Sequence, residues 1–276
     1  METKMRISIC GCGWLGQPLA KSLSQAGFPV TGTKQSESGI QSLRQAGIDG
    51  VVLQLPLGTA DIASLEDFLS ADLLIVNVPP GRRNMTAASY IEKITGLSQA
   101  AKQAGCKRMI FISTTSVYGD AEGEVTEDTI PVPTTISGQA HFHLEQSLRQ
   151  MWGQDLIVLR LAGLIGPHRH PVKYLAGGQA IANGRAPVNL VHLDDVIRAV
   201  MAMLKRWPTM TTLHLCAPQH PSRELYYREM ARLAGLPVPE FLQEGENGKW
   251  INAERTAREL GLDWQHEDLL SLAPEY

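Results

Sequence analysis

The chain contains little cysteine, and its few thiols are scattered. Four cysteines occur in 276 residues, which is too few for a disulfide framework in a chain of this length. Cys10 and Cys12 are separated by one residue, and no second pair completes a tetrahedral metal site. We therefore predict no disulfide scaffold and no metal site, and we expect these two thiols to be buried or to line a turn.

The chain also lacks an excess of either charge and any long apolar run. Lysine and arginine number 25 against 28 aspartates and glutamates, which gives a formal net charge of −3. This balance creates no broad field for nucleic acid or a membrane surface. Glycines interrupt the first apolar segment, unlike the core of a signal peptide, and no run is long enough to cross a membrane. We expect a cytoplasmic monomer or homodimer without a nucleic-acid or membrane partner.

A glycine motif near the start is the most informative feature that is present. A strand pattern at residues 6–10 leads directly into Gly11-Cys-Gly-Trp-Leu-Gly16, and a helical pattern follows. Such glycines permit a tight turn, close approach of a pyrophosphate and packing of the helix on the strand, while the helix N-terminus attracts phosphate. The alternative is an ordinary glycine-rich turn. The predicted dinucleotide contacts here are Gly11, Gly13, Trp14, Leu15 and Gly16.

Strand and helix patterns alternate along the first half of the chain. This alternation predicts βαβ units and an α/β fold with a doubly wound parallel sheet. The expected strands are 6–10, 30–33, 50–55, 73–78, 108–113, 156–161 and 212–216. The expected helices are 15–26, 40–46, 63–69, 88–104, 139–151 and 192–207.

The amino-acid composition changes in two segments, which are rich in glycine, proline and histidine. These are residues 163–189 and the part from Ala217 onward, which includes helical patterns at 222–234 and 252–260. We predict a dinucleotide-binding domain at 1–163, completed by 190–216, and a smaller substrate-binding lobe mainly at 164–276. Ligands of open α/β sheets bind at the carboxyl ends of the strands, which such a lobe would cover.

The end of the second expected strand bears on the choice of nucleotide. NAD-specific proteins place an acid there for the ribose 2′-hydroxyl, whereas this chain has Thr33 followed by Lys34. A lysine near hydroxyls suits a 2′-phosphate. The cofactor prediction is therefore NADP, with NAD as the alternative if Lys34 is only a solvated charge.

A loop with two prolines follows the fourth expected strand. Pro79 and Pro80 turn the backbone toward the adenosine ribose and phosphates, and Arg82 or Arg83 would cover the pyrophosphate. The alternative is a surface loop with solvated arginines.

Four segments, taken in order, resemble the extended short-chain dehydrogenase/reductase superfamily of nucleotide-sugar epimerases and dehydratases, and within it an atypical bacterial branch. The likeness spans nearly the whole chain. It implies a Rossmann-like domain, a nicotinamide cofactor and a C-terminal substrate lobe for a small polar or anionic metabolite such as a nucleotide sugar. The segments are Gly11–Gly16, Phe111–Asp120, Leu159–Pro167 and Val191–Val196.

The main departure from that family is the loss of its Tyr-x-x-x-Lys pair. Aligned on the family pattern, the tyrosine is Ser137 and the lysine is His141, while Thr114 falls on the family's Ser/Thr position that orients the substrate oxygen. Serine is too weak an acid to replace the phenol, so His141 or Tyr118 is expected to move the proton. A Ser137–His141 pair one helical turn apart is also available. The alternatives are a structural His141 and a Tyr118 that only shapes its loop.

A basic loop follows the sixth expected strand. His168, Arg169 and His170, with Lys173 nearby, suit an anionic ligand. Metal binding by the two histidines lacks a partner carboxylate or thiol pattern, and a plain loop is the other alternative. Asp195 begins the next helix, where we expect it to be structural.

Two functions follow from these features. The first is an NAD(P)-binding oxidoreductase or nucleotide-sugar epimerase/dehydratase-type enzyme with an altered catalytic pair. The second is a non-catalytic NADP-binding redox sensor that acts through a protein partner, which the loss of Tyr-x-x-x-Lys supports.

Overall fold

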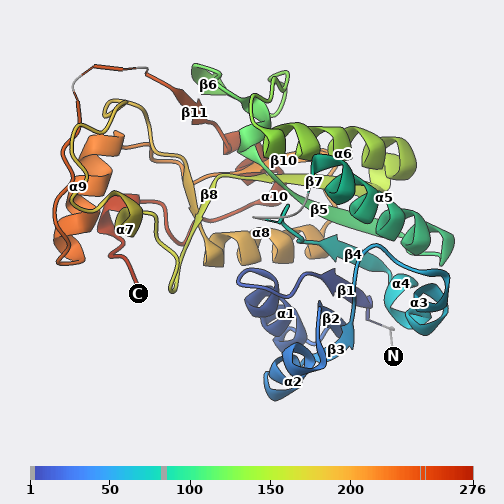
Figure 1. Ribbon diagram of the computed structural model, residues 1–276. Coiled ribbons are helices and arrows are strands. Elements are labelled where there is room, and N and C mark those ends of the chain that lie inside the picture. Colours follow the sequence, from blue (N-terminus) through green and yellow to red (C-terminus); the bar gives the residue numbers. More distant parts are fainter. Residues whose placement is uncertain (1–3, 82–85, 243, 246, 276) are drawn as a thin grey trace. The chain divides into compact units, whose positions relative to one another are not determined.

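The fold consists of two compact units in a computed structural model (Figure 1). The structure describes residues 4–81, 86–242, 244–245 and 247–275. The first unit comprises Met1–Ser113, Thr135–Leu159 and Thr209–Thr211, and the second comprises Thr114–Thr134, Arg160–Pro208 and Thr212–Tyr276. The predicted domain limits differ from these units at residues 114–134, 160–163, 190–208 and 212–216, which group with the second unit.

A seven-stranded sheet has the order β10-β7-β5-β4-β1-β2-β3. The pairs β1–β2, β1–β4, β2–β3 and β4–β5 are parallel. The chain winds outward in both directions from β1, so its order reverses between β1 and β4, which is where doubly wound sheets bind ligands. The strands are β1 (Ile7–Cys10), β2 (Val30–Lys34), β3 (Asp49–Val52), β4 (Leu73–Val76), β5 (Arg108–Thr114), β7 (Leu156–Leu161) and β10 (Thr212–Leu215).

Helices of the first unit begin at side-chain caps where the sequence offers a hydroxyl. Ser36, Thr86 and Thr135 each accept a hydrogen bond from the backbone N–H three residues later, which satisfies a free amide of the first turn. Buried residues of α5 and α6 join those of β4, β5 and β7 in one apolar core. The helices are α1 (Gly16–Gln25), α2 (Glu37–Gln45), α3 (Thr59–Ser64), α4 (Glu66–Leu69), α5 (Ala87–Gln103) and α6 (Ile136–Trp152).

The second unit contains shorter elements around its own apolar core, which includes Tyr226, Met230 and Leu269. Two pairs of three-residue strands are parallel, β6 with β11 and β8 with β9. The strands are β6 (Gly123–Val125), β8 (Gly163–Ile165), β9 (Leu190–His192) and β11 (Lys249–Ile251). The helices are α7 (Val172–Leu175), α8 (Leu193–Lys205), α9 (Arg223–Leu233) and α10 (Glu254–Leu260). Short 3₁₀ turns occupy Thr115–Tyr118, Gly153–Asp155 and Leu269–Ser271.

The predicted doubly wound α/β sheet is confirmed, and each strand expected in it is present. The helix expected at 63–69 is two short helices, α3 and α4, which meet at Leu65. The short strands β6, β8, β9 and β11 were not predicted, because three residues carry too little periodicity to be recognised.

Burial keeps the cysteine thiols protonated. All four cysteines are buried and free, and burial raises the pKa of Cys12 to about 11 and that of Cys10 to about 12. Thiols so strongly held in the protonated state are poor metal ligands.

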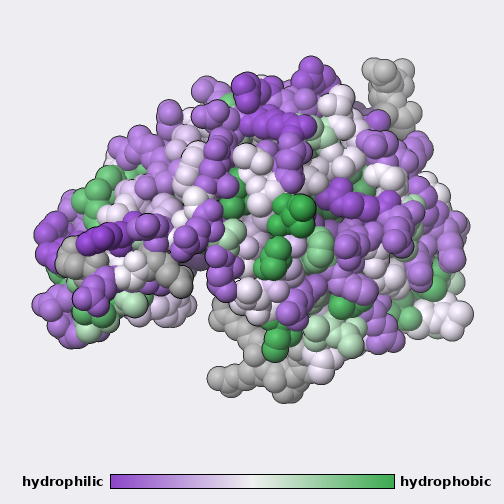
Figure 2. Space-filling model, turned by 90° about the horizontal axis from the view of Figure 1, so that it is seen from above, coloured by the Kyte–Doolittle hydropathy of each residue, from purple (hydrophilic) through white to green (hydrophobic). Residues whose placement is uncertain are grey.

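Hydrophilic residues cover most of the face in Figure 2, where apolar residues form small separate areas. Among the described residues, no helix combines the length and hydropathy that a membrane span requires.

Candidate functional site

The turn between β1 and α1 is built around two glycines. Gly11 has a φ of +99°, and a Cβ there would lie 2.4 Å from the backbone oxygen of Asn77. A Cβ on Gly16 would lie 2.2 Å from the oxygen of Gly11. The Asn77 side chain also donates from Nδ2 to that oxygen at 3.2 Å. The chain therefore needs glycine at both positions to bring the ends of β1 and β4 together.

The middle glycine of the motif has different surroundings. Gly13 is exposed, and no described atom lies within 4 Å of the place where its Cβ would be. The fold itself therefore does not require glycine at this position. A pyrophosphate bound against the backbone would require it. Half-buried Trp14 and buried Leu15 follow and lead into α1.

Thr33 holds the glycine turn from the end of β2. Its Oγ1 accepts a hydrogen bond from the amide of Gly11 at 3.0 Å. Its carbonyl oxygen accepts one from the amide of Cys12 at 3.2 Å. Thr33 is 4% exposed, so its hydroxyl is committed to the turn rather than presented to solvent.

Lys34 follows Thr33 and reaches toward α1. Its Nζ donates to Oε1 of Gln17 at 3.0 Å. Ser36, two residues later, caps α2 by accepting from the amide of Gly39 at 3.3 Å. An ammonium group close to a helix N-terminus and a hydroxyl forms surroundings that stabilise an anion.

These groups open onto a cavity of about 380 Å³ in the first unit. Of the predicted cofactor residues, Gly11, Gly13, Thr33, Lys34 and Pro79 line it. Trp14, Leu15, Gly16 and half-buried Pro80 adjoin these residues in the chain without lining the cavity. The prediction for Arg82 and Arg83 falls outside the described residues.

Helix α5 contributes cavity residues that the sequence did not reveal. Tyr90, Lys93 and Ile94 line the cavity, and the hydroxyl of Tyr90 donates to the carbonyl oxygen of Val78 at 2.7 Å. The helical pattern of residues 88–104 indicated core packing. Half-buried Lys93 is a single cation on this helix, and one cation is not a specific signal for a cavity.

In α6, Ser137 and His141 are joined through the backbone. The Nδ1 of His141 lies 2.8 Å from the carbonyl oxygen of Ser137, and because a carbonyl can only accept, Nδ1 carries the proton. The exposed hydroxyl of Ser137 takes no part in this bond. The imidazole of His141 therefore contacts the backbone of Ser137 and not its hydroxyl, which was the contact expected from the sequence.

His141 is 6% exposed and lies between aromatic rings. Its Nε2 is 3.5 Å from the hydroxyl of Tyr90, and its ring centroid lies 6.0 Å from that of Phe111. Burial lowers the pKa of His141. The imidazole is therefore neutral near physiological pH, with an unprotonated Nε2 on the side of Tyr90.

A second buried polar contact lies one turn farther along α6. The hydroxyl of Ser113, at the end of β5, donates to Oε1 of Glu145 at 2.6 Å. Glu145 is 1% exposed. This contact fixes α6 to β5 beside His141, because a buried carboxylate must retain its hydrogen bonds.

Thr114 begins the second unit and caps the 3₁₀ turn that follows. Its Oγ1 accepts from the amide of Ser116 at 3.1 Å and lies 2.8 Å from the hydroxyl of Ser116. Thr114 is half-buried. Its hydroxyl can form one further hydrogen bond, as an acceptor if it donates to Ser116 and as a donor if it accepts from Ser116.

Tyr118, in the same turn, is 1% exposed and has strong partners. Its hydroxyl accepts from Nη1 of Arg160 at 2.6 Å and lies 2.5 Å from Nε2 of His214. The Nδ1 of His214 donates to the carbonyl oxygen of Asn252 at 3.1 Å. The Tyr118 hydroxyl also donates to the carbonyl oxygen of Thr126 at 3.2 Å.

The basic loop divides into exposed and buried residues. His168 is exposed with a φ of +59°, in a tight turn where Gly166 and Arg169 exchange two backbone hydrogen bonds. Arg169 is exposed and donates from Nε to the carbonyl oxygen of Leu164 at 3.2 Å. These two residues are accessible to an anion.

His170 has an environment unlike the one expected from the sequence. It is 4% exposed, its Nδ1 accepts from the amide of Val172, and its Nε2 lies 2.8 Å from the hydroxyl of Tyr226. Burial lowers its pKa to about 4. The ring is neutral and packed, so any contact with an anion would be a neutral hydrogen bond.

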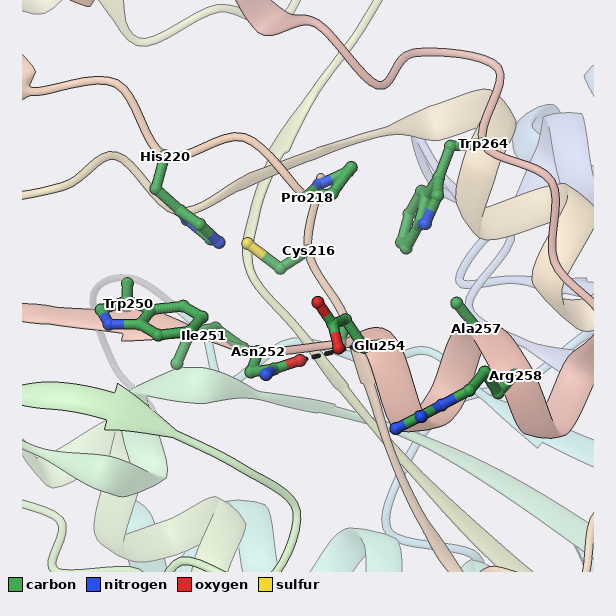
Figure 3. Close-up of a pocket in the computed structure, with 11 residues that line it drawn as sticks. Cys216, Pro218, His220, Trp250, Ile251, Asn252, Glu254, Ala257, Arg258 and Trp264 are labelled. Carbon is green, nitrogen blue, oxygen red and sulfur yellow. Dashed lines mark hydrogen bonds between the residues drawn. The ribbon is translucent and has the colours of Figure 1, made fainter.

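A second cavity, of about 280 Å³, lies in the second unit (Figure 3). Trp250 and His220 lie on one side, with ring centroids 5.6 Å apart, and Trp264 lies on the other. Glu254 and Arg258, one helical turn apart on α10, add charge to the rim.

Comparison with known proteins finds relatives that match nearly the whole chain. The profile of the "NAD dependent epimerase/dehydratase family" matches residues 7–212. Protein YeeZ of Escherichia coli is 40% identical over 273 residues, which cover 98% of this chain and 99% of YeeZ. A protein named "Uncharacterized UDP-glucose epimerase YtcB" of Bacillus subtilis is 28% identical over 125 residues, 41% of this chain and 39% of YtcB.

Solved structures share the fold. UDP-glucuronic acid 4-epimerase from Bacillus cereus, in complex with NAD, superposes with a TM-score of 0.77 at 20% identity and covers 97% of this chain and 95% of its own. The Bordetella bronchiseptica enzyme WbmG, in complex with NAD and UDP, has a TM-score of 0.80 at 18% identity, with 98% and 93% covered. Together with the extended match to the family profile and to YeeZ, these results show that the chain belongs to the NAD dependent epimerase/dehydratase family.

Proposed function

We propose that this chain is an oxidoreductase or epimerase/dehydratase-type enzyme that binds NADP in preference to NAD. Its substrate is a small polar or anionic metabolite, and a nucleotide sugar is the favoured class. The observation that carries the proposal is the cavity at the β1–α1 turn, where Gly13 leaves the backbone open. Membership of an NAD dependent family supports the cofactor class, and similar folds occur in complex with NAD and UDP or UDP-glucuronic acid.

The preference for NADP rests on the charge at the end of β2. NAD-specific sites use a carboxylate at this place to bind the ribose 2′-hydroxyl. Here Lys34, Gln35 and Ser36 line the cavity instead. To bind a 2′-phosphate, Lys34 would give up its hydrogen bond to Gln17. A contact between an ammonium group and a phosphate is stronger than that hydrogen bond to an amide.

Replacing Lys34 with alanine is expected to weaken NADPH binding about tenfold to a hundredfold, the range for loss of one charge-assisted contact. NADH affinity should change little, because NADH has no 2′-phosphate. Fluorescence titration of both nucleotides measures the effect. Lys21→Ala, at an exposed position on α1, is the matched control. Tighter binding of NADH than of NADPH by the unmodified protein would contradict the proposal.

The proposed chemistry requires a proton-transfer group beside the redox step. When bound, the nicotinamide supplies the hydride donor or acceptor. His141 is neutral with Nε2 unprotonated, which suits a general base. Thr114 would orient a substrate oxygen, Tyr118 is the alternative proton donor, and Ser137 would hold a substrate group by hydrogen bonding. His168 and Arg169, with neutral His170, would bind the anionic part of the substrate.

Replacing His141 with phenylalanine tests the base. The ring fits among aromatic neighbours, so the fold and NADPH affinity should be retained while kcat falls on the order of a hundredfold or more. His143→Ala, on the same helix but exposed, should leave kcat unchanged. The measurement is NADPH absorbance with aldehydes, ketones and nucleotide sugars. Unchanged kcat in His141→Phe would remove this residue from the mechanism.

A non-catalytic NADP-binding redox sensor is the second candidate function. It is favoured by one observation: the first position of the usual catalytic pair is an exposed serine, and its partner histidine is bonded to the helix backbone. Tight NADPH binding together with no turnover across the same substrate panel would favour the sensor. Substrate-dependent turnover at catalytic enzyme concentrations would favour the enzyme.

A further inference from the structure

Two histidines and an aspartate converge at the first turn of α8. His192 ends β9 and caps α8, Asp194 lies in its first turn, and His266 comes from the C-terminal segment. One ligand atom from each residue lies within 4.8 Å of the other two. The side chains of His192, His266 and Asp194 are 5%, 17% and 42% exposed. The cluster is therefore accessible from one side through its carboxylate.

The protonation of His192 makes this cluster unusual. The amide of Asp194 donates to His192 Nδ1 at 3.2 Å, so Nδ1 bears a lone pair. The same Nδ1 lies 3.2 Å from Oδ2 of Asp194, and a carboxylate oxygen has no proton to donate. Two lone pairs thus face one another. A cation bound by both atoms would convert this repulsion into attraction.

Two of the three distances between the ligand atoms match the edges of a tetrahedral site. Bonds of zinc to imidazole nitrogen and carboxylate oxygen place neighbouring ligand atoms about 3.3 Å apart. Oδ2 of Asp194 lies 3.2 Å from His192 Nδ1 and 3.0 Å from His266 Nε2. The ring centroids of the two histidines are 3.9 Å apart, so both imidazoles approach the same carboxylate oxygen.

The surroundings hold the three side chains in place. The carboxylate of Asp195, which is fully buried, accepts from the amides of Gln265 at 2.7 Å and His266 at 3.2 Å. This contact fixes the backbone that carries His266 against α8. The positive end of the α8 dipole opposes a cation here, and the two first-turn aspartates offset it.

From this geometry we infer that His192, Asp194 and His266 form a binding site for a divalent transition metal of the zinc class. Two imidazoles and one carboxylate suit zinc and its neighbours better than calcium or magnesium. Three protein ligands leave a position for water. The bound metal joins the C-terminal segment to α8, a role independent of the proposed function at the β1–α1 turn.

Titration of the tag-free, full-length chain with Zn²⁺ in a non-chelating buffer tests the inference. We expect one saturable equivalent by calorimetry and slower amide exchange at residues 265–266 after zinc is added. His266→Ala and Asp194→Asn should each weaken zinc binding at least tenfold. His168→Ala, which removes an exposed histidine outside the cluster, should bind zinc as the unmodified chain does.

Folding and metal loss are separated by measuring circular dichroism of each variant in EDTA. If His266→Ala does not fold, Asp194→Asn carries the test, because its side chain is the most exposed of the three. Co²⁺ in place of Zn²⁺ should give the visible absorption of a tetrahedral site. Absence of saturable binding, or equal binding by His266→Ala or Asp194→Asn and the unmodified chain, overturns the inference and leaves a hydrogen-bonded His–Asp–His cluster.

Discussion

Replacing Gly13 with valine should raise the dissociation constants for NADPH and NADH at least a hundredfold while leaving the protein folded. A Cβ at this position would meet no described atom within 4 Å, so we expect the free energy of unfolding to change by less than about 0.5 kcal/mol. It would fill the space where a pyrophosphate must approach the backbone. Nucleotide titration and urea unfolding of the same preparation measure both quantities.

Gly16→Ala is the matched control, because it separates the demands of the fold from those of the ligand. Its Cβ would lie 2.2 Å from the oxygen of Gly11, so the turn itself must shift. We expect this variant to lose stability as well as nucleotide affinity. If Gly13→Val binds either nucleotide as tightly as the unmodified protein does, no dinucleotide lies across this turn and the proposed function fails.

Replacing Tyr118 with phenylalanine should lower the free energy of unfolding by about 2–4 kcal/mol, the cost of leaving buried polar and charged groups without a hydrogen bond. The phenol bonds both Arg160 and His214 in an environment that is 1% exposed. Arg160 itself is 4% exposed, so water cannot readily replace the lost acceptor. Urea unfolding measures the loss.

The same variant also tests the chemistry proposed for Tyr118. NADPH affinity should be retained, because the nucleotide cavity is lined by residues 10–94, and turnover should be abolished if the phenol is the proton donor. Tyr174→Phe, at a tyrosine that is 79% exposed, should change neither property. Full turnover in a destabilised Tyr118→Phe protein would assign this residue to the fold alone.

Much of the fold could be predicted because its signals are local. β7 has the limits expected from its apolar run. Helix α6 begins at Ile136, three residues before the expected start, because Thr135 caps Gly138 and extends the first turn. The periodicity of apolar residues shows that a segment is helical, whereas the capping residue decides where the helix begins.

The short strands could not be predicted, since their stability comes from distant partners. β11 pairs with β6 in a register that places Trp250 opposite Glu124. Each strand has three residues, too few for an alternating pattern to be recognised. The pairing depends on how the intervening chain folds.

The candidate site could likewise be predicted only where its signals are local in the sequence. Glycine spacing predicted the tight turn of Gly11, Gly13 and Gly16 between β1 and α1, because its signal lies within six positions. The sequence contained no sign that Tyr90 and Lys93 line the same cavity. It also could not distinguish exposed His168 from buried His170, since two similar side chains in one loop differ only in which way the backbone turns them.

By itself, the sequence determined the alternation of strands and helices and the glycine turn between β1 and α1, which depend on neighbours a few residues apart. Tertiary structure alone decided which polar groups meet. Tyr118 and His214 are 96 residues apart in the chain, and His266 is 72 residues from Asp194. Such contacts depend on the path of the whole backbone, and hydrogen-bond chemistry becomes specific only after that path has brought the atoms within about 3 Å.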